Sequence, residues 1–322
     1  MNLTRKLIVL LTVALASPAT LAQGYPSKPI RIVVPFPPGG GTDLIARESS
    51  QRVARATGWI FVIDNKPGAG GNLGVDAVAK SAPDGYTLVF GQTSNLAINP
   101  TLYAKLPYDP QKDLAPIVLV ANAPLVMVTG ASSPYQTLAD AVAAAKAQPG
   151  AVNFASPGNG TVAHLTSELF QKAASVKTQH IPYKGAAQAL TDVISGNVEL
   201  YMSSVPTLLG QIKQGKLRAL AVTSARRVDD LPNVPTLSES GYKGFDAATW
   251  FGYLAPAGTP KEIVSLLNFE FNKALQQPEL RKRLADEGAA AIGGTSEQFA
   301  TLIKEEIARW GKVVRESGAR VD

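Results

Sequence analysis

The sequence has no cysteine, only two histidines, and few aromatic residues, which make up 7% of its 322 positions. Without cysteine the chain can be neither a disulfide-stapled scaffold nor a lipoprotein anchored through a cysteine thiol. Its stability must come from apolar burial, and 45% of the residues are hydrophobic. A chain of this length can bury an ample core and favours two lobes over one.

Motifs for catalysis and nucleotide binding are also scarce. No G-x-S-x-G nucleophile elbow occurs, and no Walker lysine follows any glycine-rich loop. Of the two histidines, His164 has Glu168 four residues later and His180 has no nearby carboxylate, which is too little for a metal site. We therefore expect neither metal nor cofactor. His164 either contacts a ligand or is a hydrogen-bonded structural histidine.

The lack of a long apolar run decides how the N-terminal segment is interpreted. Arg5 and Lys6 precede the apolar residues 7–16, and small residues stand one and three positions before Gln23. The apolar stretch is too short to span a bilayer, and no later stretch offers about 18 uninterrupted apolar residues. We expect residues 1–22 to be a signal peptide that is cleaved before Gln23, which places the mature protein in the periplasm.

The net charge of the chain gives little information about the ligand. The formal net charge is +6, and removing the two basic residues of the signal peptide lowers it to +4. A mild basic excess suits an anionic ligand, although ordinary surface solvation explains it more simply. No sustained basic stripe with interleaved aromatic residues occurs, so we do not expect the protein to bind nucleic acid.

Short apolar runs alternate with longer amphipathic stretches over most of the chain. Besides residues 30–34, the predicted buried strands are residues 62–63, 87–90, 117–120, 125–128, 152–154, 200–202 and 217–222. The stretches between them mostly have helical spacing. This alternation predicts an α/β fold in which each lobe is a mainly parallel sheet flanked by helices.

The C-terminal third breaks the alternation and is predicted to be helical. Its last helix carries a buried stripe of Ile303, Ile307, Trp310 and Val314. If this tail packs on the N-terminal lobe, the chain crosses between lobes twice, near residues 121–124 and near residues 242–250. The first lobe is then residues 23–123 with 246–322, the second is residues 124–245, and the ligand cleft lies between them.

The most informative motif follows the first predicted strand. It consists of Phe36, Pro37, Pro38, Gly39, Gly40, Gly41, Thr42 and Asp43. The glycines let the backbone approach a ligand, and a helix that starts at Asp43 with Thr42 as its N-cap leaves N–H groups unpaired beside a partial positive charge. The motif therefore predicts an anion site, because ligands of open α/β sheets bind beyond the carboxyl ends of the strands.

Three further loops follow predicted strands and are candidates for ligand contact. The loop with Ser156, Gly158, Asn159, Gly160 and the N-cap candidate Thr161 repeats the physics of the first motif, and His164 stands behind it. The loop of Gln92, Thr93, Ser94 and Asn95 offers short polar side chains, and Tyr183 and Lys184 offer a phenol and a cation. Plain turns and a solvated lysine are the alternatives to a ligand role.

The glycine-rich stretch over residues 68–74 suggests a dinucleotide site but does not fit one. The pattern that starts at Gly68 needs glycine or alanine at position 73, where Leu73 stands. Export also removes the protein from the nicotinamide pool. Helix capping and close packing explain this stretch better.

The chain resembles a known family along nearly its whole mature length. The segments that carry the resemblance are residues 25–31, 33–43, 65–72, 81–87, 99–100, 108–110, 156–165, 205–207 and 231–236. They are similar to the Bug family, the extracytoplasmic solute receptors of tripartite tricarboxylate transporters.

The resemblance implies a function and a set of ligand contacts. A bilobed periplasmic binding protein of the type II-like kind would close on a small carboxylate and, in many members, deliver it to a membrane permease. One carboxylate would meet the loop from Phe36 to Asp43, partly through water, and the other end would meet the loop from Ser156 to Thr161. Phe245, Asp246 and Ala247 would also line the cleft. We expect a monomer that binds a di- or tricarboxylate, an aromatic carboxylate or an acidic amino acid.

Two other functions fit the sequence less well. A secreted hydrolase could use Asp43, Ser94 or His164, and it would turn its substrate over, whereas a receptor returns its ligand intact. A solute receptor could also serve a membrane sensor instead of a permease.

Overall fold

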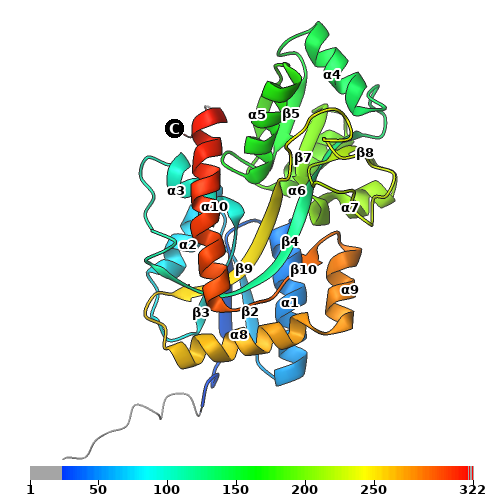
Figure 1. Ribbon diagram of the computed structural model, residues 1–322. Helices are drawn as coiled ribbons and strands as arrows, with labels where there is room; N and C mark the ends of the chain where they lie inside the picture. The colour runs from blue at the N-terminus through cyan, green and yellow to red at the C-terminus, as the bar shows by residue number, and fades with distance from the viewer. Residues whose placement is uncertain (1–23, 318, 320, 322) are drawn as a thin grey trace, which may run out of the picture.

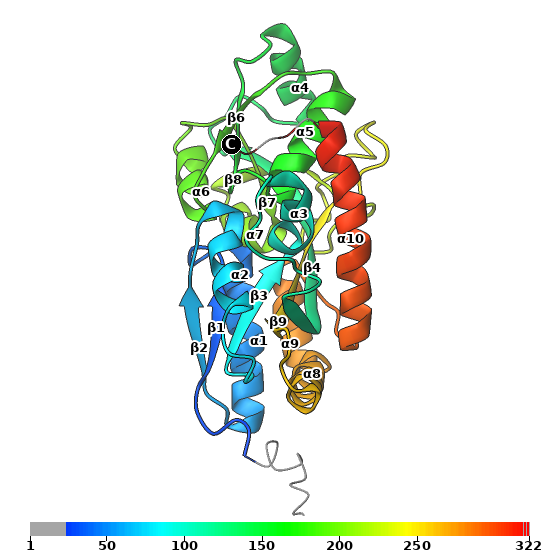
Figure 2. The same cartoon turned by 90° about the vertical axis from the view of Figure 1, so that its left-hand side faces the viewer.

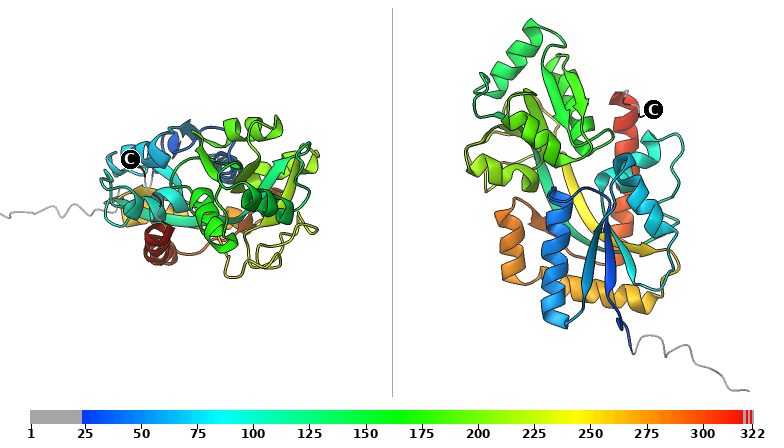
Figure 3. Two further views of the ribbon diagram at one scale, coloured as in Figure 1. Left: turned by 90° about the horizontal axis from the view of Figure 1, so that it is seen from above. Right: turned by 180° about the vertical axis from the view of Figure 1, so that it is seen from behind.

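A computed structural model describes residues 24–317, 319 and 321. The predicted signal peptide, residues 1–22, and its cleavage site before Gln23 lie outside these residues. The chain forms two lobes, one above the other in Figure 1, and the view from behind in Figure 3 shows them joined by two long strands. No helix among the described residues is both long enough and apolar enough to cross a membrane.

The first lobe, at the bottom of Figure 1, begins with strand–helix alternation, as the sequence predicts. Its elements up to the first crossing are β1 (Ile30–Val34), α1 (Gly41–Thr57), β2 (Phe61–Asn65), η2 (Ala69–Gly71), α2 (Asn72–Ala79), β3 (Thr87–Gln92), η3 (Ser94–Ile98) and α3 (Asn99–Leu102). Strand β1 pairs in parallel with β2 on one side and β3 on the other, as Figure 2 shows. Strand β1, between the two others, is buried except at Arg31 and otherwise consists of Ile and Val.

The second lobe has the same kind of construction. Its elements are α4 (Leu138–Ala147), β5 (Asn153–Ser156), α5 (Val162–Ala174), β6 (Gln179–Pro182), α6 (Ala186–Ile194), β7 (Leu200–Ser204), α7 (Val205–Lys213) and β8 (Leu217–Val222). Strand β5 pairs in parallel with β6 and β7. Parallel pairing brings the carboxyl ends of these strands to one edge, and this edge faces the first lobe.

Two antiparallel strands connect the lobes: β4 (Leu114–Gly130) and β9 (Ala248–Pro256). The two runs predicted as separate strands, residues 117–120 and 125–128, are parts of one strand of 17 residues, so the prediction of two strands was wrong. Residues 121–124 stay extended because they pair with β9, as far as Pro124 opposite Ala248. From Leu125 onward β4 pairs instead with β7 and β8.

The sheet is therefore mixed. The parallel arrangement predicted for each lobe holds for the outer strands, whereas β4 and β9 join it in antiparallel fashion because they carry the chain between the lobes in opposite directions. The lobe limits predicted from the sequence fall inside β4, at residues 123/124, and just before β9, at residues 245/246. These limits stay a prediction.

The C-terminal part returns to the first lobe through α8 (Lys261–Leu275), α9 (Pro278–Asp286), β10 (Ala290–Ala291) and α10 (Ser296–Ser317). Figure 1 shows α10 upright along the side of the molecule, and it contacts η3, α3 and β4 as well as α5 of the second lobe. Ile303, Trp310 and Val314 of the predicted stripe are buried and Ile307 is half-buried. The prediction of an amphipathic helix packed on the N-terminal lobe is confirmed.

A buried carboxylate ties α10 to the connecting strands. Glu306 Oε2 accepts hydrogen bonds at 3.0 Å from the indole nitrogens of both Trp250, on β9, and Trp310, on α10 itself. Arg309 lies 2.6 Å from the other carboxylate oxygen and balances the charge. A buried carboxylate is stable only when it is paired and hydrogen-bonded in this way.

We expect Glu306→Ala to lower the free energy of unfolding by roughly 2–3 kcal/mol, because it leaves two buried indole N–H groups and Arg309 without their acceptor. Chemical denaturation measures the change. The control is Glu305→Ala, since Glu305 is the exposed neighbour on the same helix. Equal losses in the two variants would contradict the account.

Candidate ligand-binding cleft

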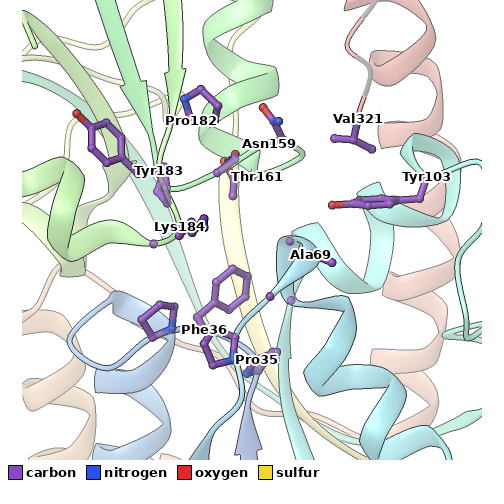
Figure 4. Close-up of a pocket in the computed structure, with 18 residues that line it drawn as sticks. Pro35, Phe36, Ala69, Tyr103, Asn159, Thr161, Pro182, Tyr183, Lys184 and Val321 are labelled. Atoms are coloured by element: carbon purple, nitrogen blue, oxygen red, sulfur yellow. Dashed lines mark hydrogen bonds between the residues drawn. The ribbon is translucent and has the colours of Figure 1, made fainter.

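A cleft of about 650 Å³ opens between the lobes, beyond the carboxyl ends of β1, β5 and β6. The first lobe lines it with Pro35, Phe36, Pro37, Pro67, Gly68, Ala69, Gly70, Gly71, Tyr103 and, from the C-terminal segment, Val321. The second lobe lines it with Pro157, Gly158, Asn159, Thr161, Pro182, Tyr183, Lys184 and Gly185. In Figure 4 Phe36 lies below Lys184, and Tyr103 and Val321 lie across the cleft from Tyr183.

A narrow recess of about 50 Å³ lies beside this outer cleft, at the N-terminus of α1. Phe36, Pro37, Pro157, Thr161 and Gly185 line both spaces, so the recess and the outer cleft adjoin. The other residues around the recess are Gly40, Gly41, Thr42, Gln92, Ala186, Ser203, Ser204 and Thr207. The recess is therefore surrounded by hydroxyl and amide side chains and by the first turn of a helix.

Helix α1 begins two residues earlier than predicted. Its N-cap is Gly40, which has extended backbone and no capping side chain, and Gly41 and Thr42 already belong to the helix. The Gly41 N–H donates to Thr207 Oγ1 across the lobes at 3.0 Å. The N–H groups of Thr42 and Asp43 also lie in the first turn, where no carbonyl one turn back can accept them.

Asp43 holds the first loop in place and does not line the cleft. Its carboxylate accepts hydrogen bonds from the Gly39 N–H at 3.0 Å, from Arg47 Nε at 3.0 Å and from Asn65 Nδ2 at 2.9 Å. Burial would raise the pKa of Asp43, but these bonds lower it below its usual value. Asn65 Nδ2 also donates to the Phe36 carbonyl, so the network fixes both ends of the loop.

The second loop, residues 156–161, also has supporting residues beneath those that line the cleft. Thr161 is the N-cap of α5, as predicted, and its Oγ1 accepts the His164 N–H at 3.3 Å. The Gly160 N–H donates to His164 Nδ1 at 3.2 Å. Ser156, Gly160 and His164 are buried, whereas Gly158, Asn159 and Thr161 face the cleft.

Other predicted contacts lie away from both spaces. Thr93 and Ser94 are buried in a helical segment, and Thr93 Oγ1 accepts the Trp250 N–H at 2.9 Å, so only Gln92 of that loop borders the recess. Pro38 and Gly39 are exposed and border neither space.

The three residues beside the second crossing do not line the cleft either. Asp246 borders a separate recess together with Trp250 and Arg309, because the β9 end that it precedes meets α10. The Ala247 N–H donates to the carbonyl of Thr223, the residue after β8, at 3.2 Å. Phe245 packs against the apolar core.

The sequence reading missed the wall formed by Pro67 and residues 68–71. Gly68, Gly70 and Gly71 adopt left-handed backbone, and a side chain on Gly71 would meet Asn95 and the Phe36 ring. Asn99 Nδ2 supports this stretch by donating to the Gly70 carbonyl at 3.2 Å. The glycine content of residues 68–71 is the signal in the sequence, although capping and close packing are the simpler explanation of it there.

Among the described residues that line the two spaces, Lys184 carries the only charged side chain. Its side chain is exposed to solvent in the outer cleft. Tyr183 beside it donates through its hydroxyl to Asp192 Oδ2 at 2.6 Å, and burial together with this bond raises the pKa of Tyr183 to about 12. The bond to Asp192 holds the phenol in position.

Comparison with known proteins identifies the family. The model of the tripartite tricarboxylate transporter family receptor matches residues 45–319. The chain belongs to this family. The protein BugT of Bordetella pertussis is 41% identical over 326 residues, which cover 100% of both chains. The resemblance to the Bug family is thus confirmed, and its members are receptors that bind solutes.

Solved structures show the fold. The R. palustris protein Rpa4515, described with adipate, is 35% identical with a TM-score of 0.90 over 92% of this chain and 100% of its own. MatC from Rhodopseudomonas palustris, described with bound malate, is 32% identical with a TM-score of 0.85 over 90% of this chain and 100% of its own. The fold is that of a two-lobed periplasmic binding protein, as predicted.

The two histidines of the second lobe predict a pH dependence of stability. Burial, with His180 nearby, lowers the pKa of His164 to about 3, and burial lowers that of His180 to about 4, whereas both titrate near 6.5 in an unfolded chain. At pH 7 both histidines are mostly neutral in the folded and in the unfolded protein. Below pH 6.5 the unfolded chain binds protons that the folded protein does not, so stability falls.

We expect the free energy of unfolding to fall between pH 7 and pH 5 by up to about 1.4 kcal/mol per pH unit for each histidine. Glu168 opposes the trend, because burial raises its pKa. Denaturation at both pH values measures the slope, and His180→Gln should reduce it. A stability that rises on acidification would contradict the prediction.

Proposed function

We propose that this protein is a periplasmic receptor that captures a small carboxylate between its lobes and delivers it to the membrane permease of a tripartite tricarboxylate-type transporter. The observation that carries the proposal is the narrow recess at the N-terminus of α1, which opens into the outer cleft. A carboxylate that enters the recess meets backbone N–H groups and hydroxyls, and its hydrocarbon body extends into the outer cleft.

The recess suits an anion for electrostatic reasons. Helix α1 has 17 residues, and its positive end borders the recess at Gly41 and Thr42 of the first turn. Ser204 and Thr207 add hydroxyls, and their oxygens lie 3.0 Å apart. None of the described residues that line either space has a carboxylate side chain, so nothing on these walls repels a negative ligand.

The outer cleft limits the chemistry of the part of the ligand that lies outside the recess. Prolines 35, 37, 67, 157 and 182 and the rings of Phe36 and Tyr103 make its walls largely apolar. Lys184 lines the outer cleft but not the recess, next to Gly185, which lines both, and provides a partner for a second charge. A short dicarboxylate fits this pattern, as does an aromatic carboxylate or an acidic amino acid, and adipate and malate are named with two solved relatives.

The proposed contact residues are those of the predicted set that line the two spaces. They are Phe36, Pro37, Gly40, Gly41 and Thr42 in the first lobe and Gly158, Asn159, Thr161, Tyr183 and Lys184 in the second. Closure would turn residues 23–123 with 246–322 against residues 124–245 about β4 and β9, the two strands that connect the lobes.

Export and partnership complete the proposal. Removal of residues 1–22 would release the mature receptor, as a monomer, into the periplasm, where the family's receptors meet their substrates. The family description supports a transporter partner.

Ligand binding should stabilise the fold. We expect adipate or malate at one hundred times its dissociation constant to raise the free energy of unfolding by about 2.7 kcal/mol. The matching diamides have nearly the same shape without the charge and should have little effect. Thermal-shift measurements with both sets, followed by mass spectrometry to show that the ligand is returned intact, test the proposal. No shift with any aliphatic or aromatic carboxylate, or with any acidic amino acid, would refute it.

Closure should depend on the absence of a side chain at position 41. A Cβ on Gly41 would lie 2.7 Å from Ser204 Oγ and 3.2 Å from Thr207 Oγ1, across the lobe boundary. We therefore expect Gly41→Ala to weaken carboxylate binding at least tenfold, because the alanine holds the lobes apart. Calorimetry gives the affinity, and small-angle scattering should show a ligand-induced contraction in the parent protein only.

The matched control is Gly210→Ala. Gly210 lies within helix α7, and a Cβ there meets nothing within 4 Å. Both changes add a methyl group to a helix, so they should affect the helices similarly. Unchanged affinity in Gly41→Ala would count against closure at this contact.

A further inference from the structure

Two histidines that do not border the cleft lie directly behind its second-lobe wall. The rings of His164, on α5, and His180, on β6, stack with centroids 4.1 Å apart and planes inclined by 8°. They are the only histidines in the sequence. Their packing side by side beneath residues 156–161 has no role in the ligand contacts proposed above.

Each ring holds a different part of the loop. His180 Nε2 lies 2.7 Å from Ser156 Oγ, and this hydroxyl also lies 3.1 Å from the Gly158 carbonyl oxygen and 3.3 Å from the Gly158 nitrogen. His164 Nδ1 accepts the Gly160 N–H at 3.2 Å. The two imidazoles therefore fix both glycines of the turn.

The hydrogen bonds define which nitrogen carries the proton. Because His164 Nδ1 accepts from Gly160, the proton of the neutral ring is on Nε2, which faces Glu168 Oε1 at 3.9 Å. If the Ser156 hydroxyl donates to the Gly158 carbonyl, His180 must donate from Nε2 to Ser156 Oγ. The neutral His180 ring then donates to the Ser156 hydroxyl, which donates to the Gly158 carbonyl, so these hydrogen bonds link β6 to the turn.

The turn needs this support because its backbone is unusual. Gly158 has φ of +149° and Gly160 has φ of +75°, and a Cβ on Gly158 would lie 3.1 Å from the Tyr183 carbonyl oxygen. Glycines gain the most conformational freedom when a turn loosens, so a glycine-rich loop keeps one shape only where other groups hold it. Gly158, Asn159 and Thr161, which line the cleft, depend on that shape.

We propose that His180 is a positioning residue of the ligand-binding cleft, which holds residues 156–161 in their binding conformation through the Ser156 hydroxyl, with His164 as the stacked second support. This inference rests on the proposed function. It assigns the hydrogen bond of His180, rather than the bulk of its ring, as the feature on which affinity depends.

Two substitutions at position 180 separate these features. His180→Phe keeps an aromatic ring against His164 but removes the contact to Ser156, whereas His180→Gln loses the ring and keeps an amide donor close to the position of Nε2. With adipate and malate as probes, we expect His180→Phe to weaken binding about tenfold and His180→Gln to stay within about threefold of the parent protein. A ring that acts through packing alone would give the reverse order.

The role of the Ser156 hydroxyl is tested with the same two probes. Ser156→Ala should weaken binding about as much as His180→Phe, and the double variant should be no weaker than either single variant, because the two side chains form one link. Gln179→Ala, at an exposed position next to His180 on the same strand, is the control and should leave affinity unchanged. Additive losses in the double variant would overturn the proposal.

A readout without ligand keeps this test separate from the proposed function. We expect hydrogen exchange of the Gly158 and Gly160 amides in the unliganded protein to be faster in His180→Phe than in the parent or in His180→Gln. If the parent binds neither probe, the transport proposal fails for these ligands and the exchange data alone decide the role of His180. Equal exchange in all three proteins would refute the positioning role.

Discussion

The hydrogen-bonded ladder between β4 and β9 is the constraint on which the rest of the structure depends. It carries the chain twice between the lobes, and β4 exchanges β9 for β7 and β8 as partners at Pro124 and Leu125. Because proline has no N–H to donate, it is suited to the point where one ladder ends and another begins. The ladder sets the two lobes face to face, so that the carboxyl ends of β1 and β5 point into the same cleft.

Two sets of residues form the cleft: one set lines it, and a second set lies behind the first and supports it. The residues that line it are mostly glycine, proline and small polar residues, which bring backbone close to a ligand. The residues behind them are the strong hydrogen-bonding groups: Asp43 with Asn65 in the first lobe, and Ser156 with the two histidines in the second. In the proposed function, helix N–H groups and a single lysine recognise the charge of the ligand, and the buried polar groups keep the loops that carry them in place.

Much of this could be predicted from local pattern. Alternating apolar runs predicted the α/β lobes, helical spacing predicted the C-terminal helix, and glycines after strands predicted both cleft loops. The predictions were wrong where a residue far away in the sequence determines the local structure or the burial of a side chain. Residues 121–124 have no strand signal of their own and are extended because β9 pairs with them. Thr93 can be buried because its hydroxyl accepts the N–H of Trp250, 157 residues later in the chain.

The sequence by itself determined the family, the fold class and the two loops that face each other, because these depend on spacing within short segments. Only the tertiary structure decided which side chains of those loops face the ligand space. Asp43 is predicted as a ligand contact, but its carboxylate holds the first loop in place through hydrogen bonds. The glycines of residues 68–71 are predicted to serve capping and packing, but they line the cleft. The direction of a side chain depends on which groups from other elements satisfy its hydrogen bonds, and folding alone brings those groups together.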